Sequence, residues 1–209
     1  DTEPVPSGDA PVEAPPPSKG DVEEPTTNTT AADSTESNEW YTPARYIEAV
    51  RDVLGGIGLD PASSQEAQKI VQADRYYTRE DDGLAQSWET ESLWGNPPYN
   101  REDGEPGNEV WVPRWHEAVT TGEAAAGILL IYAKTDTNYF QCLWQHWLCF
   151  TDHRIAFEKP GEEKHSPRKG NVFAYCGPDP EKFATVFDQF GQIVPPANLD
   201  DERPAGGAE

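Results

Sequence analysis

Four adjacent residues, Asn96, Pro97, Pro98 and Tyr99, have types and spacing that point directly to chemistry. Two successive prolines remove two backbone donors and fix two φ angles, so neither a helix nor a central strand can run through them. Pro97 also favours extended geometry at Asn96. The sequence therefore predicts a stiff turn after an apolar strand, with one amide, free carbonyls and an aromatic ring held together. On local grounds alone, an ordinary strand that ends at a Pro-Pro turn explains these residues about equally well.

The chemistry that this turn allows is the activation of a planar amino group. The lone pair of an exocyclic amino nitrogen is delocalised into its ring, which makes the nitrogen a poor nucleophile. If the Asn96 side-chain oxygen and the Pro97 carbonyl both accept from the NH2 group, they favour a tetrahedral nitrogen with an available lone pair. The nearby ring of Tyr99 can stack on the planar group.

The order of several motifs carries a resemblance to a known family. The motifs are Thr42-Pro43, Asp60-Pro61-Ala62-Ser63, Asp82-Gly83-Leu84, Trp88 and Asn96-Pro97-Pro98-Tyr99. Over residues 39–194 the chain resembles the phage-type (Dam-like) DNA adenine-specific N-6 methyltransferases, which depend on S-adenosylmethionine. The Asp-Pro-Ala-Ser segment lacks the glycines that usually follow it in such enzymes. The Asn-Pro-Pro-Tyr signature also occurs in methyltransferases that act on a protein glutamine amide.

The resemblance implies a reaction and a set of site residues. The expected reaction is direct methyl transfer from S-adenosylmethionine to the exocyclic amino nitrogen of adenine in DNA, with the base flipped from the duplex and no metal. The alternatives are methylation of a protein glutamine or of cytosine, and a non-catalytic methyltransferase-like binding protein. The implied catalytic residues are Asn96, Pro97, Pro98 and Tyr99. The implied cofactor-binding residues are Trp40, Tyr41, Thr42, Pro43, Asp60, Pro61, Ser63 and Asp82, with Asp81 as the second choice for Asp82.

The elements that must position these residues are those of an α/β domain. Thr42 and Pro43 are expected to start an amphipathic helix over 44–54 that ends at Gly55-Gly56. Asp60 follows a short strand over 57–59, and the end of such a strand is where a doubly wound sheet binds ligands. The other expected elements are helices at 65–69, 111–121 and 183–190 and strands at 70–77, 127–132, 147–150, 154–157, 171–176 and 191–194. The prediction is a Rossmann-like methyltransferase fold, with a mostly parallel sheet, an antiparallel hairpin near its C-terminal edge and helices on both faces.

Two segments are expected to contact DNA. The triplet Thr135-Asp136-Thr137 follows the buried strand 127–132, where a helix N-cap cluster and a lining of the target-base pocket are about equally expected. The segment 158–170 is the basic patch of an acidic domain, and we expect phosphate contacts there, with a solvated hairpin loop as the alternative. The expected DNA-binding residues are Thr135, Asp136, Thr137, Phe157, Lys164, His165, Arg168 and Lys169.

Charge composition divides the chain. Residues 1–38 hold nine Asp or Glu against one Lys and almost no large apolar residues. We therefore expect a disordered acidic tail at 1–38, a catalytic domain at 39–199 and a shorter acidic tail at 200–209. The formal net charge of −22 has the wrong sign for DNA binding at ordinary salt. A halophilic origin, in which carboxylates keep the surface solvated in concentrated salt, resolves this; an acidic protein that binds no nucleic acid is the alternative.

The same composition bears on where the protein works. The three Cys show neither metal-site nor disulfide spacing, which is typical of a reducing compartment. No apolar run is long enough for a signal peptide or a membrane span. Together with the resemblance, this predicts a cytoplasmic protein of phage or provirus type, with a monomer favoured and DNA as its partner.

Overall fold

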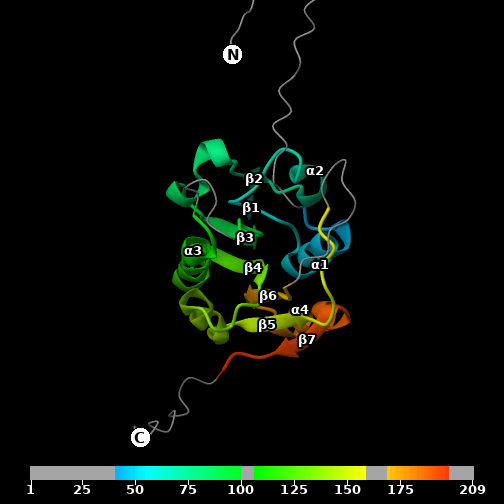
Figure 1. Cartoon of the computed structure of the whole chain (residues 1–209). Coiled ribbons are helices and arrows are strands. Elements are labelled where there is room, and N and C mark those ends of the chain that lie inside the picture. Colours follow the sequence, from blue (N-terminus) through cyan, green and yellow to red (C-terminus); the bar gives the residue numbers. More distant parts are fainter. Residues whose placement is uncertain (1–40, 100–105, 159–168, 198–209) are drawn as a thin grey trace, which may run out of the picture. The chain divides into compact units, whose positions relative to one another are not determined.

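The structure is a computed structural model, and it describes residues 41–99, 106–158 and 169–197. Within these ranges seven strands form one sheet in the order β2-β1-β3-β4-β6-β5-β7 (Figure 1). The strands are β1 Leu59–Asp60, β2 Arg75–Tyr76, β3 Thr90–Gly95, β4 Ala124–Tyr132, β5 Trp147–Thr151, β6 Asn171–Cys176 and β7 Gly191–Val194.

The pairing between neighbouring strands changes once along the sheet, from parallel to antiparallel. Neighbours among β2, β1, β3 and β4 are parallel, whereas β6 is antiparallel to β4, β5 to β6, and β7 to β5. The predicted α/β fold, with parallel N-terminal strands and antiparallel C-terminal strands, is therefore confirmed. Because β1, β3 and β4 run the same way, the residues that follow them meet at one edge of the sheet.

Helices cover both faces of the sheet, as predicted (Figure 1). In β4, Ile128 and Leu130 pack with α1 and α4 on one face, while Leu129 and Ile131 pack with α3 on the other, because successive strand residues point to opposite faces. The α-helices are α1 Ala44–Leu54, α2 Gln68–Val71, α3 Asn108–Thr121 and α4 Pro180–Phe187. Four 3-10 helices also occur: η1 Arg79–Asp81, η2 Gly83–Ala85, η3 Asn138–Gln145 and η4 Asp188–Phe190.

The helix α1 matches its predicted bounds, but its start differs from the prediction. Gly55 ends the helix in the left-handed region at φ 76°, where glycine is favoured. Pro43, not Thr42, occupies the N-cap position, and no side chain caps the helix. The expectation that Thr42 caps α1 is therefore wrong, because its hydroxyl bonds with Asn96 instead.

The expectation of a strand over 70–77 is also wrong. The helix α2 occupies its first residues, and β2 is only Arg75–Tyr76. Gln68 makes the difference, because its side-chain oxygen accepts from the Ala73 amide at 2.8 Å and closes the turn through Gln72, which has φ 50°. The helix expected at 65–69 accordingly begins three residues later.

Several other predicted bounds shift. The segment 154–157 is not a strand, because Ile155 and Phe157 turn into the core and the pairing there is an isolated bridge between Tyr41 and Glu158. The helix expected at 183–190 begins at Pro180, since the Asp179 side chain caps the Lys182 amide, and it ends at Phe187 before η4. The helix expected at 111–121 begins at Asn108, β4 begins at Ala124, and β1 is Leu59–Asp60.

No helix among the described residues is long and apolar enough to cross a membrane.

Candidate functional site

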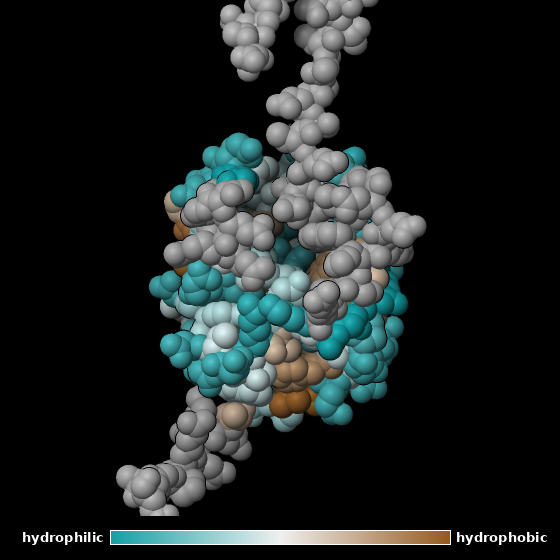
Figure 2. Space-filling model, viewed as in Figure 1, coloured by the Kyte–Doolittle hydropathy of each residue, from teal (hydrophilic) through white to brown (hydrophobic). Residues whose placement is uncertain are grey.

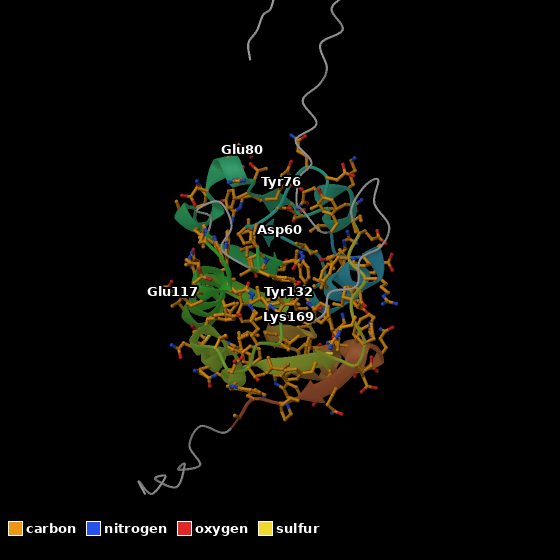
Figure 3. All side chains as sticks on the ribbon, viewed as in Figure 1. Asp60, Tyr76, Glu80, Glu117, Tyr132 and Lys169 are labelled. Atoms are coloured by element: carbon orange, nitrogen blue, oxygen red, sulfur yellow. The ribbon has the colours of Figure 1, made fainter. Side chains whose placement is uncertain are left out.

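The edge where β1, β3 and β4 end brings the predicted site residues together. Asp60 is the last residue of β1, Asn96 follows β3, and Tyr132 ends β4. Asn171, which opens the antiparallel strand β6, pairs with Tyr132 and so lies at the same edge. Figure 3 labels Asp60 and Tyr132 between the flanking helices, and Figure 2 shows this side of the molecule as mostly hydrophilic with a recess near its centre.

Asn96 is fixed in place at one end of its side chain and unpaired at the other. Its amide nitrogen donates to the Thr42 hydroxyl at 3.0 Å, and Thr42 is 6% exposed. Its side-chain oxygen is buried and has no hydrogen-bond partner among the described residues. Buried acceptors in folded proteins are nearly always paired, so this oxygen is suited to accept from a ligand.

The two prolines make the turn rigid, as the sequence predicts. Pro97 is buried and Pro98 is exposed. Immediately before them, Gly95 lies against β4, where a Cβ would come within 3.1 Å of the Leu129 side chain. The turn therefore rests directly on the neighbouring strand.

Tyr99 is half-buried among aromatic rings. Its ring centroid lies 4.1 Å from that of Tyr132 and 6.1 Å from that of Phe157. Its hydroxyl accepts from the Asn171 amide nitrogen at 3.4 Å. Burial, and to a lesser extent Tyr132, raises the pKa of Tyr99 well above its usual value, so the phenol is neutral.

Sequence reasoning missed Asn171 and Tyr132. Asn171 is 1% exposed, and its side-chain oxygen, like that of Asn96, is buried without a described partner. The signal in the sequence was a polar residue that opens an otherwise apolar strand, but nothing local says that this strand pairs with the end of β4. Tyr132 is the last residue of the predicted strand 127–132, and its role emerges only from its contact with Tyr99.

Asp60 is the second buried polar centre. It is 2% exposed, and its carboxylate accepts from the Gln68 side chain at 3.1 Å and the Ala62 amide at 3.4 Å. The same Gln68 nitrogen donates to the Ser63 hydroxyl at 2.7 Å. Burial raises the pKa of Asp60 to about 6, and hydrogen bonds with Ser63, Ala62 and Gln68 offset part of that rise.

The two candidate adenine-binding carboxylates have different surroundings. Asp81 accepts from both the amide and the hydroxyl of Thr78 and so closes the capping box of η1, which is a structural role. Asp82 is exposed and has φ 50°. The adjoining Gly83 lies so close to the Pro61 carbonyl that no Cβ would fit, and its own carbonyl accepts from Trp88. This contact brings the backbone next to Asp82 against Pro61, the residue that follows β1.

An apolar pocket lies between the Asp60 and Asn96 turns. Aromatic rings from α3 and the segment before β3 form much of its wall, and the indole nitrogen of Trp115 there is buried without a described partner. The pocket is lined by Pro61, Ala62, Trp88, Gly95, Pro97, Trp111, Trp115 and Leu129. The described residues contain no group of three or more His, Cys, Asp or Glu that could hold a metal ion.

The remaining predicted residues are distributed around this edge. Tyr41 is held by its bridge to Glu158, next to Thr42 and Pro43. Thr135 and Asp136 are exposed, while the Thr137 hydroxyl closes the turn after β4 by donating to the Lys134 carbonyl. Phe157 is 4% exposed and touches Tyr99, and the Lys169 ammonium lies 5.5 Å from the Tyr132 ring centroid. Trp40, Lys164, His165 and Arg168 lie outside the described residues, as do 1–38 and 200–209.

The architecture defines a class of protein. A ligand edge in a mixed sheet with parallel N-terminal strands, together with a buried carboxylate, an apolar pocket and an Asn-Pro-Pro-Tyr turn, is that of the S-adenosylmethionine-dependent amino-methyltransferases. The family model described as DNA N-6-adenine-methyltransferase (Dam) matches residues 28–176, more than half of the 209 residues, and the chain belongs to this family. It is an adenine-specific DNA methyltransferase that uses S-adenosylmethionine, which confirms the predicted family, enzyme class and cofactor.

The match begins at residue 28, ahead of the domain start expected at residue 39. Neither the curated proteins nor the solved structures give a match. The roles of individual residues therefore rest on the geometry described above.

Proposed function

We propose that Asn96 and the Pro97 carbonyl hold the exocyclic amino group of the target adenine, and that Tyr99 stacks on the base. The observation that carries this proposal is the buried, unpaired side-chain oxygen of Asn96, whose amide nitrogen is bonded to Thr42. A target amino group would supply the missing donor. The family favours adenine in DNA over cytosine or a protein glutamine.

The mechanism follows from what these residues do to the amino group. S-adenosylmethionine supplies an activated methyl group when bound. Asn96 accepts a hydrogen bond from the amino nitrogen, and this bond strengthens as positive charge develops there, which stabilises the transition state more than the ground state. No side chain of the protein acts as a nucleophile in this proposal. The amino nitrogen would take the methyl group directly as the carbon–sulfur bond of the donor breaks, and it would then lose one proton to solvent. The base must leave the duplex, because its amino group cannot otherwise reach the turn.

The residues at the end of β1 fit the cofactor. Asp60 offers a buried carboxylate to hydroxyl or amino donors, with Ser63 beside it, and Asp82 lies at the same strand end. Trp88, Trp111 and Trp115 border the region between the Asp60 and Asn96 turns. We propose Thr42 and Pro43 as further cofactor contacts, since the Thr42 hydroxyl bonds with the Asn96 amide at this edge of the sheet.

The experiment is methyl transfer from labelled S-adenosylmethionine to duplex DNA, followed by chromatography and mass spectrometry of the nucleosides. We expect N6-methyladenine in the DNA and no label in protein. N4-methylcytosine, or label on protein glutamine, would overturn the assignment of the target. A fluorescent 2-aminopurine placed at the mapped target position tests flipping, because its emission rises when the base leaves the stack.

Several finer predictions stay proposals. We propose a halophilic, cytoplasmic monomer of phage or provirus type; folding and activity should rise with KCl toward the molar range, where the Debye length falls to about 3 Å. Full stability in dilute buffer would contradict the halophilic origin. Deletion of residues 1–38 should leave methyl transfer unchanged, because that composition cannot bury a core.

A further inference from the structure

The basic side chains of the described ranges fall into two groups. Those of the first group are engaged by a carboxylate or by a backbone carbonyl, except Arg79, which has a different interaction. The carboxylate pairs are Lys69 with Glu66, Arg114 with Glu123 and Lys182 with Asp52. The carbonyl pairs are Arg51 with Ile70 and Val71, and Arg75 with Glu89.

The second group is Arg45, Lys134, Arg154 and Lys169, and we call it the basic rim. Within the described ranges no ion pair joins any of the four to a carboxylate. Arg45, Arg154 and Lys169 are exposed and Lys134 is half-buried. In a chain of formal net charge −22, four basic side chains without a described carboxylate partner are unexpected unless an anion binds them.

One half of the basic rim runs from α1 to the start of β6. The Arg45 guanidinium lies 3.3 Å from the His153 ring, and Arg154 is the next residue along the chain. The carboxylate of Asp152, which precedes His153 in the chain, bonds with His153 at 2.6 Å. Arg154 then reaches Gly170, where its terminal nitrogen lies 2.7 Å from the position that a Cβ would occupy. Glycine at 170 therefore lets the guanidinium approach the backbone.

The other half joins the ends of β4 and β6. The Ala133 amide donates to the Gly170 carbonyl at 2.9 Å, so Lys134 and Lys169, the neighbours of these two residues in the chain, are brought to the same place. The Lys169 ammonium lies 5.5 Å from the Tyr132 ring centroid, and Figure 3 labels the two residues next to each other. The four basic residues therefore form one continuous group from α1 to β4.

The basic rim borders the catalytic turn. Tyr132, under Lys169, packs against Tyr99 at 4.1 Å between ring centroids. Arg45 lies in the first turn of α1, three residues after the Thr42 that bonds with Asn96. An anion on the basic rim would thus lie next to a base held by Asn96 and Tyr99.

We propose that the basic rim binds backbone phosphates of the substrate DNA on either side of the flipped adenine. The inference rests on the proposed function, and three of the four residues, Arg45, Lys134 and Arg154, lie outside the set that the sequence pointed to. Phosphate contacts made by Lys and Arg fix the register of a protein on DNA and release counterions. The acidic remainder of the surface repels DNA, so the basic rim also restricts how the duplex can approach.

The test compares two quadruple variants that remove the same charge. The rim variant carries R45Q, K134Q, R154Q and K169Q, and the control variant carries K69Q, R75Q, R79Q and K182Q. The dissociation constant for a fluorescent duplex is measured by anisotropy from about 0.05 to 0.5 M KCl, a range chosen to span the Debye lengths at which phosphate contacts respond. Thermal unfolding and affinity for S-adenosylmethionine, both expected to match the wild type, report the folding of each variant.

In the rim variant the slope of log Kd against log salt should be smaller by about 3 to 4, since each of the four phosphate contacts contributes about 0.9. At 0.1 M salt this corresponds to binding weaker by on the order of 10³-fold, if the proteins bind alike near 1 M. The control variant should keep the wild-type slope. Equal slopes for the two variants, while the wild type methylates DNA, would overturn the basic rim and leave the function standing. If a polyglutamate competes for the wild-type protein as well as DNA of the same charge does, the proposal is also overturned, because the basic rim would then recognise negative charge in general and not phosphate. A wild type that methylates no DNA would instead defeat the proposed function itself.

Discussion

Replacing Asn96 with alanine separates the catalytic role of this residue from its structural one. The change removes the unpaired side-chain oxygen and also the donor to Thr42. Loss of one preorganised polar contact of this kind costs roughly 3–4 kcal/mol in the transition state, or about 10²–10³ in rate, by analogy with oxyanion-hole donors. The affinities for cofactor and DNA should change far less, because the contact strengthens only as charge develops on the nitrogen.

The stability of the same variant should not fall in the way that its rate does. A buried acceptor without a partner costs the free protein about 1–3 kcal/mol, while the lost bond to Thr42 stabilised it by about 1 kcal/mol. Because the two contributions oppose each other, Asn96→Ala should unfold within about 1–2 kcal/mol of the wild type, or prove slightly more stable. An enzyme that is fully folded and almost inactive is the expected phenotype.

The assay is single-turnover methyl transfer at saturating DNA and cofactor, with chemical denaturation measured in parallel. Asn96→Asp is the matched variant: its carboxylate still accepts from the amino group, so its loss of rate should be smaller than that of Asn96→Ala. Methylation by Asn96→Ala at the wild-type rate would refute the reasoning, since the Asn96 side chain would then have no catalytic role. A loss that appears entirely in the affinity for DNA would refute it as well.

Three further predictions test the surroundings of the turn. Thr42→Val, which keeps the shape but removes the acceptor at 3.0 Å, should free the Asn96 amide and lower the single-turnover rate about tenfold, the worth of one ordinary hydrogen bond. Because burial raises the pKa of Asp60 to about 6, calorimetry should show affinity for S-adenosylmethionine rising as pH increases through 6, and Asp60→Asn should remove that dependence. Ionising Asp60 also disfavours the folded free protein, so its unfolding free energy should fall by roughly 2 kcal/mol between pH 4 and 7, and not in Asp60→Asn. Tyr99→Phe, which loses only the 3.4 Å bond from Asn171, should keep most of the rate, whereas Tyr99→Ala should lose about 1–3 kcal/mol of base stacking in DNA-binding measurements.

The parts of the fold that local rules predict are those with strong local causes. The bounds of α1 follow from its amphipathic pattern and from Gly55, and β6 from its continuous apolar run. Asp60 and the Asn96 turn lie at strand ends as predicted, because a Pro stops each strand. The prediction of a strand over 70–77 failed because a short apolar run fits a helix or a strand equally well. Here the hydrogen bond between the Gln68 side chain and the Ala73 amide favours the helix.

The parts of the site that could not be predicted depend on contacts between distant segments. Thr42 and Asn96 are 54 residues apart, and their bond overrides the capping role that local rules gave to Thr42. Asn171 meets Tyr99 across 72 residues, which requires the order β3-β4-β6 and the register of β6 on β4. The basic rim could not be predicted for the same reason. Its four residues come from four separate segments, which are brought together only by the order of the strands in the sheet.

Two of the three buried amide oxygens without a described partner, those of Asn96 and Asn171, connect this long-range geometry to catalysis. Each is buried at the edge where Tyr99 lies, and each destabilises the free protein as long as no donor reaches it. The prolines prevent the backbone at Asn96 from relaxing to find a donor, and the Thr42 bond holds its amide in place. An acceptor kept unpaired in this way needs no reorganisation when an amino group arrives, which is the condition for electrostatic stabilisation of a transition state. It follows that apolar substitutions at Asn96 that stabilise the free protein should be the ones that abolish methyl transfer, because both effects come from removing the same oxygen.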